Sequence, residues 1–237
     1  MREDSFISVD IETTGLSPVK DKIIEIGALK VVEGKVIEEF DILIDPRVEL
    51  PERIVELTGI SQDMLTGRPT IEEVLPKFLE FAKDLPLLGH NIVFDYSFLK
   101  TAAVKQKLVF ERKGIDTLQI ARTLLSDLES KSLEALCQYY GIVNKKHHRA
   151  FEDAKATMML YEKLSSHENA TSELLKSKPL VYRVKKVEPA TLRQKKLLKD
   201  LIKYHKIEIR QSIDTMTKSE ASRLMDQIFS TYGRLPS

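Results

Sequence analysis

Apolar and polar residues alternate with a period of two along the first part of the chain. In residues 6–12 the odd positions are apolar and the even positions are mostly polar, which predicts a β-strand with two different faces. Thr14 and Gly15 end this strand. Two further runs flank the turn at 33–35 and predict a β-hairpin over residues 22–45. We therefore expect three consecutive strands at the start of the chain.

Helical spacing of apolar residues predominates after this hairpin. Thr70 and Glu73 have the spacing of a capping box at a helix start. Residues 86–93 are short and apolar and predict a buried strand, whereas 116–123 fit either a strand end or a helix start. Helices are predicted over 51–57, 70–82, 95–106, 130–140, 151–164, 191–206 and 217–232. This order of elements predicts an α/β or α+β domain with a mixed sheet.

The chain is expected to divide into two domains. Residues 165–178 are polar and suit a linker. We place a catalytic domain at 1–168, a linker at 169–178 and a small basic helical module at 179–237. Residues 1–171 hold 22 Lys and Arg against 29 Asp and Glu, a net charge of −7; residues 172–237 hold 15 against 7, or +8. This split suits a chain that binds cations at one end and polyanions at the other, although two unrelated surfaces would give the same numbers.

Composition excludes several classes of protein. The chain is 42% hydrophobic and 31% charged, which is ordinary for a globular protein. No run reaches the roughly 18 apolar residues of a membrane helix, and the first residues do not resemble a signal peptide. We therefore expect a soluble, cytoplasmic protein without membrane contact. The single cysteine, Cys137, lies in an apolar periodic stretch and is expected to be a buried core residue.

Acidic residues and histidines occur where they could form a metal site. Asp10 and Glu12 lie two apart on one strand, so their carboxylates share a face about 6.6 Å apart along the strand. Paired carboxylates suit hard cations such as Mg²⁺ or Mn²⁺. Asp95 opens a predicted helix, and His148 precedes Asp153 across a loop and helix start. Each feature alone also fits a solvated face, a helix cap or a polar loop.

Four stretches taken together resemble a known family. They are DIETTGL from Asp10, IIEIGA from Ile23, GHNIVFDYSFL from Gly89 and HRAFEDA from His148. In order and approximate spacing these resemble the motifs of the DEDDh, or DnaQ-like, 3′–5′ exonucleases, over about residues 5–165. The resemblance implies an RNase H-like fold, in which a mixed β-sheet is flanked by helices. It also implies two divalent metal ions, Mg²⁺ or Mn²⁺.

The resemblance also implies roles for individual residues. A histidine would remove a proton from the attacking water. His148 has the family's interval of four residues to Asp153, and its neighbour His147 does not. The implied metal ligands are Asp10, Glu12 and Asp153 for the catalytic ion, and Asp10 and Asp95 for the second ion.

Substrate contacts are expected around these motifs. The resemblance places backbone amides near the 3′-hydroxyl and an apolar side chain against the terminal base. Such contacts tolerate any base, so digestion without base specificity is expected. The expected contact residues are Thr13, Thr14, Leu16, Leu57, Asn91, Phe94 and Phe98, and for each of them core packing is the alternative.

The basic module permits three interpretations. Its lysines and arginines could contact phosphates and extend the grip on DNA. They could instead form the solvated face of a helix pair, or dock a partner protein. The residues considered for nucleic-acid contact are Arg193, Lys195, Lys196, Lys199 and Lys203.

The sequence thus predicts a metal-dependent 3′–5′ exonuclease that hydrolyses DNA to nucleoside 5′-monophosphates, in proofreading or repair. Its expected partner is single-stranded DNA or a frayed 3′ end, with a DNA polymerase subunit as a further candidate. An exoribonuclease is the alternative within the enzyme class, because no motif distinguishes ribose from deoxyribose. A catalytically silent nucleic-acid-binding or replisome-tethering protein is the alternative from another class.

Overall fold

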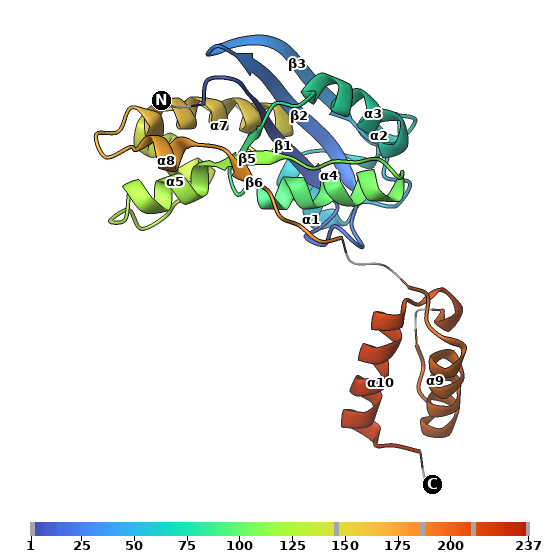
Figure 1. The fold of residues 1–237 in the computed structure, drawn as a ribbon. Helices are drawn as coiled ribbons and strands as arrows, with labels where there is room; N and C mark the ends of the chain where they lie inside the picture. The colour runs from blue at the N-terminus through green and yellow to red at the C-terminus, as the bar shows by residue number, and fades with distance from the viewer. Residues whose placement is uncertain (1–2, 145–146, 185–187, 210–211, 236–237) are drawn as a thin grey trace. The chain divides into compact units, whose positions relative to one another are not determined.

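The computed structural model describes residues 3–144, 147–184, 188–209 and 212–235 of the chain. The chain forms two compact units, Met1–Val184 and Lys185–Ser237 (Figure 1). Each unit has its own hydrophobic core and is described by itself below.

The first unit is built on a six-stranded mixed sheet with the order β3-β2-β1-β4-β5-β6. Its central strands pair antiparallel on one side, β1 with β2 and β2 with β3, and parallel on the other, β1 with β4 and β4 with β5. The strands are β1 Phe6–Thr13, β2 Ile23–Val32, β3 Lys35–Leu43, β4 Leu87–Gly89, β5 Lys113–Asp116 and β6 Lys178–Pro179. The predicted three-strand start and the mixed sheet are therefore confirmed.

Helices cover both faces of this sheet. One core joins β1 and β2 to α3 and α4, and a second joins the sheet to α5, α6 and α7 (Figure 1). Helices pack on both faces of β1, so the side chains at its even positions face a second core. In a sheet covered on one side only, they would face solvent. Phe6 and Ser8 are buried, and the Ser8 hydroxyl donates to the Ala154 carbonyl of α7 at 2.6 Å. The helices are α1 Glu52–Thr58, α2 Gln62–Leu65, α3 Ile71–Ala82, α4 Val93–Lys105, α5 Thr117–Leu124, α6 Leu133–Tyr140, α7 Ala150–Ser165 and α8 Ser172–Leu175.

Most predicted helices occur within a few residues of their expected ends, and the capping box of Thr70 and Glu73 is present. The undecided segment 116–123 is a helix: Asp116 ends β5, and its side chain accepts from two backbone N–H groups of α5. The linker predicted at 169–178 is wrong. That segment contains α8 and the start of β6, which pairs with β5, so the first unit continues to Val184.

The second unit is a pair of helices, α9 Leu192–His205 and α10 Lys218–Tyr232, connected through the short 3₁₀ helix η1 Ile213–Thr215. Each long helix opens with a threonine capping box. Gln194 near the start of α9 donates to Lys218 and Ser222 near the start of α10, and His205 and Tyr232 lie together at their ends. The two helices therefore run parallel. Leu198, Leu201 and Ile228 are among the residues that form their shared core.

No helix within the described part of the chain is both long enough and apolar enough to cross a membrane.

Candidate active site

Four carboxylates come together from three elements of the first unit. Asp10 and Glu12 lie on β1, Asp95 lies in the first turn of α4, and Asp153 lies in the first turn of α7. Pairing between β1 and β4 extends only as far as Ser8, so the backbone beyond it is free for other contacts. There the Ile11 N–H donates to the Asp95 carboxylate at 3.1 Å. The site thus forms where the two strands part.

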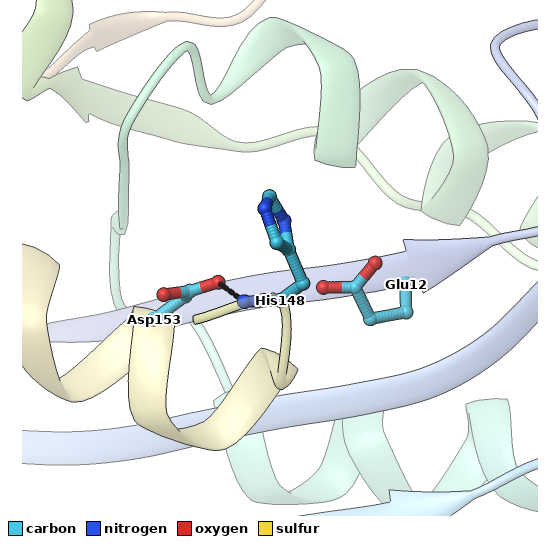
Figure 2. A group of neighbouring side chains, drawn as sticks. All are labelled: Glu12, His148 and Asp153. Atoms are coloured by element: carbon cyan, nitrogen blue, oxygen red, sulfur yellow. Dashed lines mark hydrogen bonds between the residues drawn. The ribbon is translucent and has the colours of Figure 1, made fainter. Parts of the chain in front are cut away.

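A loop before α7 brings His148 to the same place. The His148 N–H donates to Asp153 Oδ2 at 3.0 Å, and the Asn144 amide donates to the other oxygen of that carboxylate. His148 has a φ of 60°, which is uncommon for a residue other than glycine. Glu12, His148 and Asp153 each offer a ligand atom, and these atoms lie within 4.8 Å of one another (Figure 2). His147 is not part of this group.

The accessibility of these groups suits a reaction with solvent. The His148 side chain is exposed, Asp10 and Glu12 are partly exposed, and Asp95 and Asp153 are buried. Within the described residues, no hydrogen bond or ion pair holds the carboxylates of Asp10 and Glu12. Their oxygens are therefore available to a ligand from outside the chain.

Burial raises the pKa values of all four carboxyl groups, and repulsion from neighbouring cluster carboxylates raises those of Asp10 and Glu12 further. For Asp10, burial raises the pKa well above its usual range, and Asp95, Glu12 and Asp153 raise it further. Burial, followed by the charges of Asp153 and Glu25, raises the pKa of Glu12 to about 8. Burial raises the pKa of Asp95 to about 8 despite the Ile11 hydrogen bond. Burial also raises the pKa of Asp153, against hydrogen bonds that lower it.

This electrostatic pattern fits a divalent cation. Four carboxylates cannot all ionise so close together without a compensating charge, and their oxygens are the ligands that Mg²⁺ and Mn²⁺ prefer. Neither a lysine nor an arginine within the described residues forms an ion pair with any of the four. The residues present therefore suit the expected metal ions.

A buried ion pair that the sequence did not predict lies next to the cluster. Glu25 of β2 is fully buried, and Arg149 donates to both of its carboxylate oxygens at 2.6–3.2 Å. The Ala150 N–H also donates to Glu25, at 2.9 Å. This bridge, called the Glu25–Arg149 clamp below, attaches the start of α7 to β2. A charged residue within the apolar stretch IIEIGA was the sequence signal, because a buried carboxylate requires a partner.

Gly27 permits the same close approach of α7. A Cβ atom at this position would lie 2.0 Å from the Phe151 nitrogen, so any side chain would push the helix away. The clamp and this glycine together hold Asp153 and His148 against β1.

The predicted substrate-contact residues divide into exposed and buried groups. Leu16 is 83% exposed and Leu57 is 46% exposed, so core packing does not explain them. Phe98 is only 3% exposed and belongs to the core, as the alternative interpretation has it. Of the remaining residues, Asn91 is exposed and Phe94 is partly buried against Phe98. Thr13 and Thr14 are buried; the Thr13 hydroxyl donates to the Gly15 carbonyl, and the Thr14 hydroxyl accepts from the Lys22 N–H. The five basic candidates belong to α9 of the second unit.

Comparison with known proteins places the chain in a family. Residues 7–161 match the family described as Exonuclease. The DNA polymerase III PolC-type protein of Caldanaerobacter subterraneus is 45% identical over 162 residues, which cover 68% of this chain and 12% of that protein. The Thermotoga maritima protein of the same description is 44% identical over 158 residues, covering 66% and 12%. The chain thus spans about 12% of the length of these relatives.

Solved structures show the same fold. Exonuclease X in complex with 5′ overhanging duplex DNA has a TM-score of 0.58 at 24% identity, covering 72% of this chain and 96% of its own. Exonuclease I of E. coli in complex with a dT13 oligonucleotide has a TM-score of 0.62 at 20% identity, covering 70% and 42%. The RNase H-like fold is therefore confirmed, and the chain belongs to the exonuclease family, among its DnaQ-like members.

Proposed function

We propose that this chain is a metal-dependent 3′–5′ exonuclease that hydrolyses DNA to nucleoside 5′-monophosphates. The observation that carries the proposal is the convergence of four carboxylates with raised pKa values beside an exposed histidine. Relatives described as DNA polymerase III PolC-type support DNA as the substrate. Proofreading beside a polymerase and independent repair both fit this activity.

The carboxylates would hold two divalent ions, Mg²⁺ or Mn²⁺. We assign Asp10, Glu12 and Asp153 to one ion, and Asp10 and Asp95 to the other. Ions bound in this way polarise a phosphodiester and stabilise the charge on the attacking and leaving oxygens. Asp95 accepts from Ile11 and Asp153 accepts from His148 and Asn144, so two ligands are already oriented before an ion binds.

His148 is assigned as the general base. Its imidazole is exposed to solvent, while its backbone N–H is fixed by Asp153. An imidazole in such a position can take a proton from the water that attacks the terminal phosphorus. The bond from phosphorus to the 3′-oxygen of the preceding nucleotide then breaks, which releases a nucleoside 5′-monophosphate.

The terminal nucleotide would bind beside the cluster. The exposed side chains of Leu16 and Leu57 offer apolar surface against a base, which suits contact without base specificity. The loop after β1 is held by Thr13 and Thr14 hydroxyls, so its backbone is oriented for contact with the sugar end. Asn91 and Phe94 are the other assigned contacts.

Digestion of 5′-labelled single-stranded DNA and RNA of one sequence tests this function. Wild type with Mg²⁺ or Mn²⁺ should produce a ladder that shortens from the 3′ end, with DNA faster than RNA. EDTA, Asp10→Asn and His148→Ala should each abolish the ladder. Asp127, which is exposed, and His167, which is partly exposed, provide matched controls, and Asp127→Asn and His167→Ala should digest as wild type does.

Three results would contradict the proposal. Shortening from the 5′ end would reverse the polarity, and faster digestion of RNA would make the exoribonuclease correct. No digestion of either strand by folded protein would favour a binding or tethering protein.

A further inference from the structure

The second unit has a basic surface, and several of its cations form no contact that stabilises the described part of this unit. Residues 185–237 contain 12 Lys and Arg against 6 Asp and Glu, and α9 alone contains five of these cations with Asp200 as its acidic residue. Leu198 and Leu201 point into the core, so the opposite side of α9 faces solvent. Arg193, Lys196, Lys199 and Lys203 are exposed at spacings of three and four residues, which places them along that side.

The structure separates the five predicted cations into two groups. Lys195 donates to the Asp214 carbonyl at 2.8 Å, and Lys199 donates to the Asp214 carboxylate at 3.3 Å, so both help to hold the turn at η1. No ion pair or hydrogen bond with a described residue engages the side chain of Arg193, Lys196 or Lys203. These three form what we call the α9 stripe, which extends about 15 Å along the helix.

Exposed aromatic residues lie at the end of the stripe. Tyr204 is 56% exposed and Tyr232 is 53% exposed, although both are large side chains. His205 lies between them, with ring centroids 4.8 Å from Tyr204 and 5.7 Å from Tyr232. The Nε2 atom of His205 is buried without a hydrogen-bond partner within the described residues. These rings therefore present a packed aromatic surface directly after Lys203.

We propose that the second unit binds single-stranded nucleic acid, with phosphates along the α9 stripe and bases stacked on Tyr204 and Tyr232. Cations followed by exposed rings are the combination that binds single strands without sequence preference. An acidic protein would use the cations but has no need of the rings. This binding does not depend on the nuclease activity proposed above.

Fluorescence anisotropy with a labelled single-stranded dT oligonucleotide tests the proposal on the full chain in EDTA, where no strand is cleaved. The triple variant Arg193→Gln, Lys196→Gln, Lys203→Gln should weaken binding at least about tenfold and lower the slope of log K against log salt by about 2. The double variant Lys195→Gln, Lys199→Gln is the matched control and should change binding less than about threefold. Circular dichroism checks that each variant is folded.

Variants of the two tyrosines distinguish the contribution of base stacking to binding from that of charge. Tyr204→Leu and Tyr232→Leu should each weaken dT binding by about five- to tenfold without changing the salt slope, and Tyr204→Phe should bind as wild type does. Heparin, a polyanion without bases, should lose affinity with the triple variant and not with the tyrosine variants.

The proposal is overturned if the triple variant binds dT as tightly as wild type. It is also overturned if the control double variant loses as much affinity as the triple variant, or if Tyr204→Leu has no effect. Hydrolysis of a small substrate, the p-nitrophenyl ester of thymidine 5′-monophosphate, should stay unchanged in all these variants. This assay reports on the proposed nuclease activity alone, and anisotropy reports on binding by the second unit. Failure of one proposal is therefore distinguished from failure of the other.

Discussion

Two glutamates that face each other across β1 and β2 have opposite surroundings. Glu12 and Glu25 are register partners in the sheet. Glu25 is fully buried and bound by Arg149 and by the Ala150 N–H. Glu12 is partly exposed, has no ion pair within the described residues, and its pKa is raised to about 8. One carboxylate therefore stabilises the fold, whereas the other adds repulsion that the charge of Arg149 offsets only in part.

The difference shows how the site is built. The Glu25–Arg149 clamp fixes the start of α7 on the sheet, and the first turn of that helix places Asp153 in the repulsive cluster. Repulsion between the cluster carboxylates therefore lowers the stability of the fold, and the neighbouring Glu25–Arg149 clamp raises it. Functional sites typically show such local destabilisation. Changes at the two glutamates should consequently have different effects.

Glu12→Gln should reduce activity more than changes at the clamp or at the substrate contacts. Removal of one metal ligand should lower the rate of DNA digestion by about 10³-fold or more, because the ions supply several kcal/mol of transition-state stabilisation. The free energy of unfolding in EDTA at pH 9 should not fall, because one repelling charge is lost. Digestion kinetics and urea denaturation measure the two quantities. Loss of stability equal to that of a clamp variant would contradict this account.

The next effect is on stability, from Arg149→Leu. This variant leaves Glu25 buried without its partner and should lower the free energy of unfolding by about 3–5 kcal/mol. The double variant Glu25→Gln, Arg149→Leu should recover part of this loss, because no buried charge then remains unpaired. Urea denaturation of the three proteins forms the comparison. A loss below about 1 kcal/mol for Arg149→Leu would show that the clamp does not hold α7.

A smaller effect is expected from pH in the absence of metal. The folded pKa values of Glu12 and Asp95 are about 8, above the values near 4 of unfolded chains. The folded state therefore binds these protons more tightly, so the stabilisation is complete below pH 4 and is lost as the pH rises towards 8. The free energy of unfolding in EDTA should fall by at least about 1 kcal/mol more between pH 6 and 9 in wild type than in Asp10→Asn. If wild type and Asp10→Asn have the same dependence of unfolding free energy on pH, the cluster carboxylates do not repel one another as proposed.

The smallest effect is expected at the substrate contacts. Leu16→Ala and Leu57→Ala should raise KM for single-stranded DNA by about three- to tenfold, because each removes apolar surface worth about 1 kcal/mol. Their stability should stay within about 0.5 kcal/mol of wild type, since both side chains are exposed. Phe98→Ala is the contrasting variant and should destabilise the core by about 3–5 kcal/mol. A lower kcat with unchanged KM for Leu16→Ala would place Leu16 elsewhere in the mechanism.

Much of this architecture could be predicted from local sequence. Alternation along residues 6–12, the turn at 33–35 and the threonine caps at Thr70, Thr191 and Thr217 each act within a few residues, so periodicity and capping rules find them. The strand β6 could not be predicted in this way, because two residues have no period and the surrounding segment is polar. The linker was misplaced for the same reason.

The site was predicted in part. Motif spacing selected His148 and four acidic residues, which the structure brings together, but the clamp depends on contact between residues 124 positions apart. Burial likewise decided between Leu16, which is exposed, and Phe98, which is not. Long-range contacts and the burial of individual side chains depend on tertiary packing, which cannot be deduced from a single sequence.

Calorimetric titration of Mn²⁺ in two buffers of different protonation enthalpy shows whether the cluster carboxyls release protons when metal ions bind. At pH 7 several cluster carboxyls are protonated, so bound ions should displace at least one proton per chain from wild type. The Asp10→Asn variant should bind Mn²⁺ at least about tenfold more weakly, and Asp127→Asn should bind it as wild type does. Binding without proton release, or equal binding by wild type and Asp10→Asn, would contradict the claim that these carboxylates form the metal site.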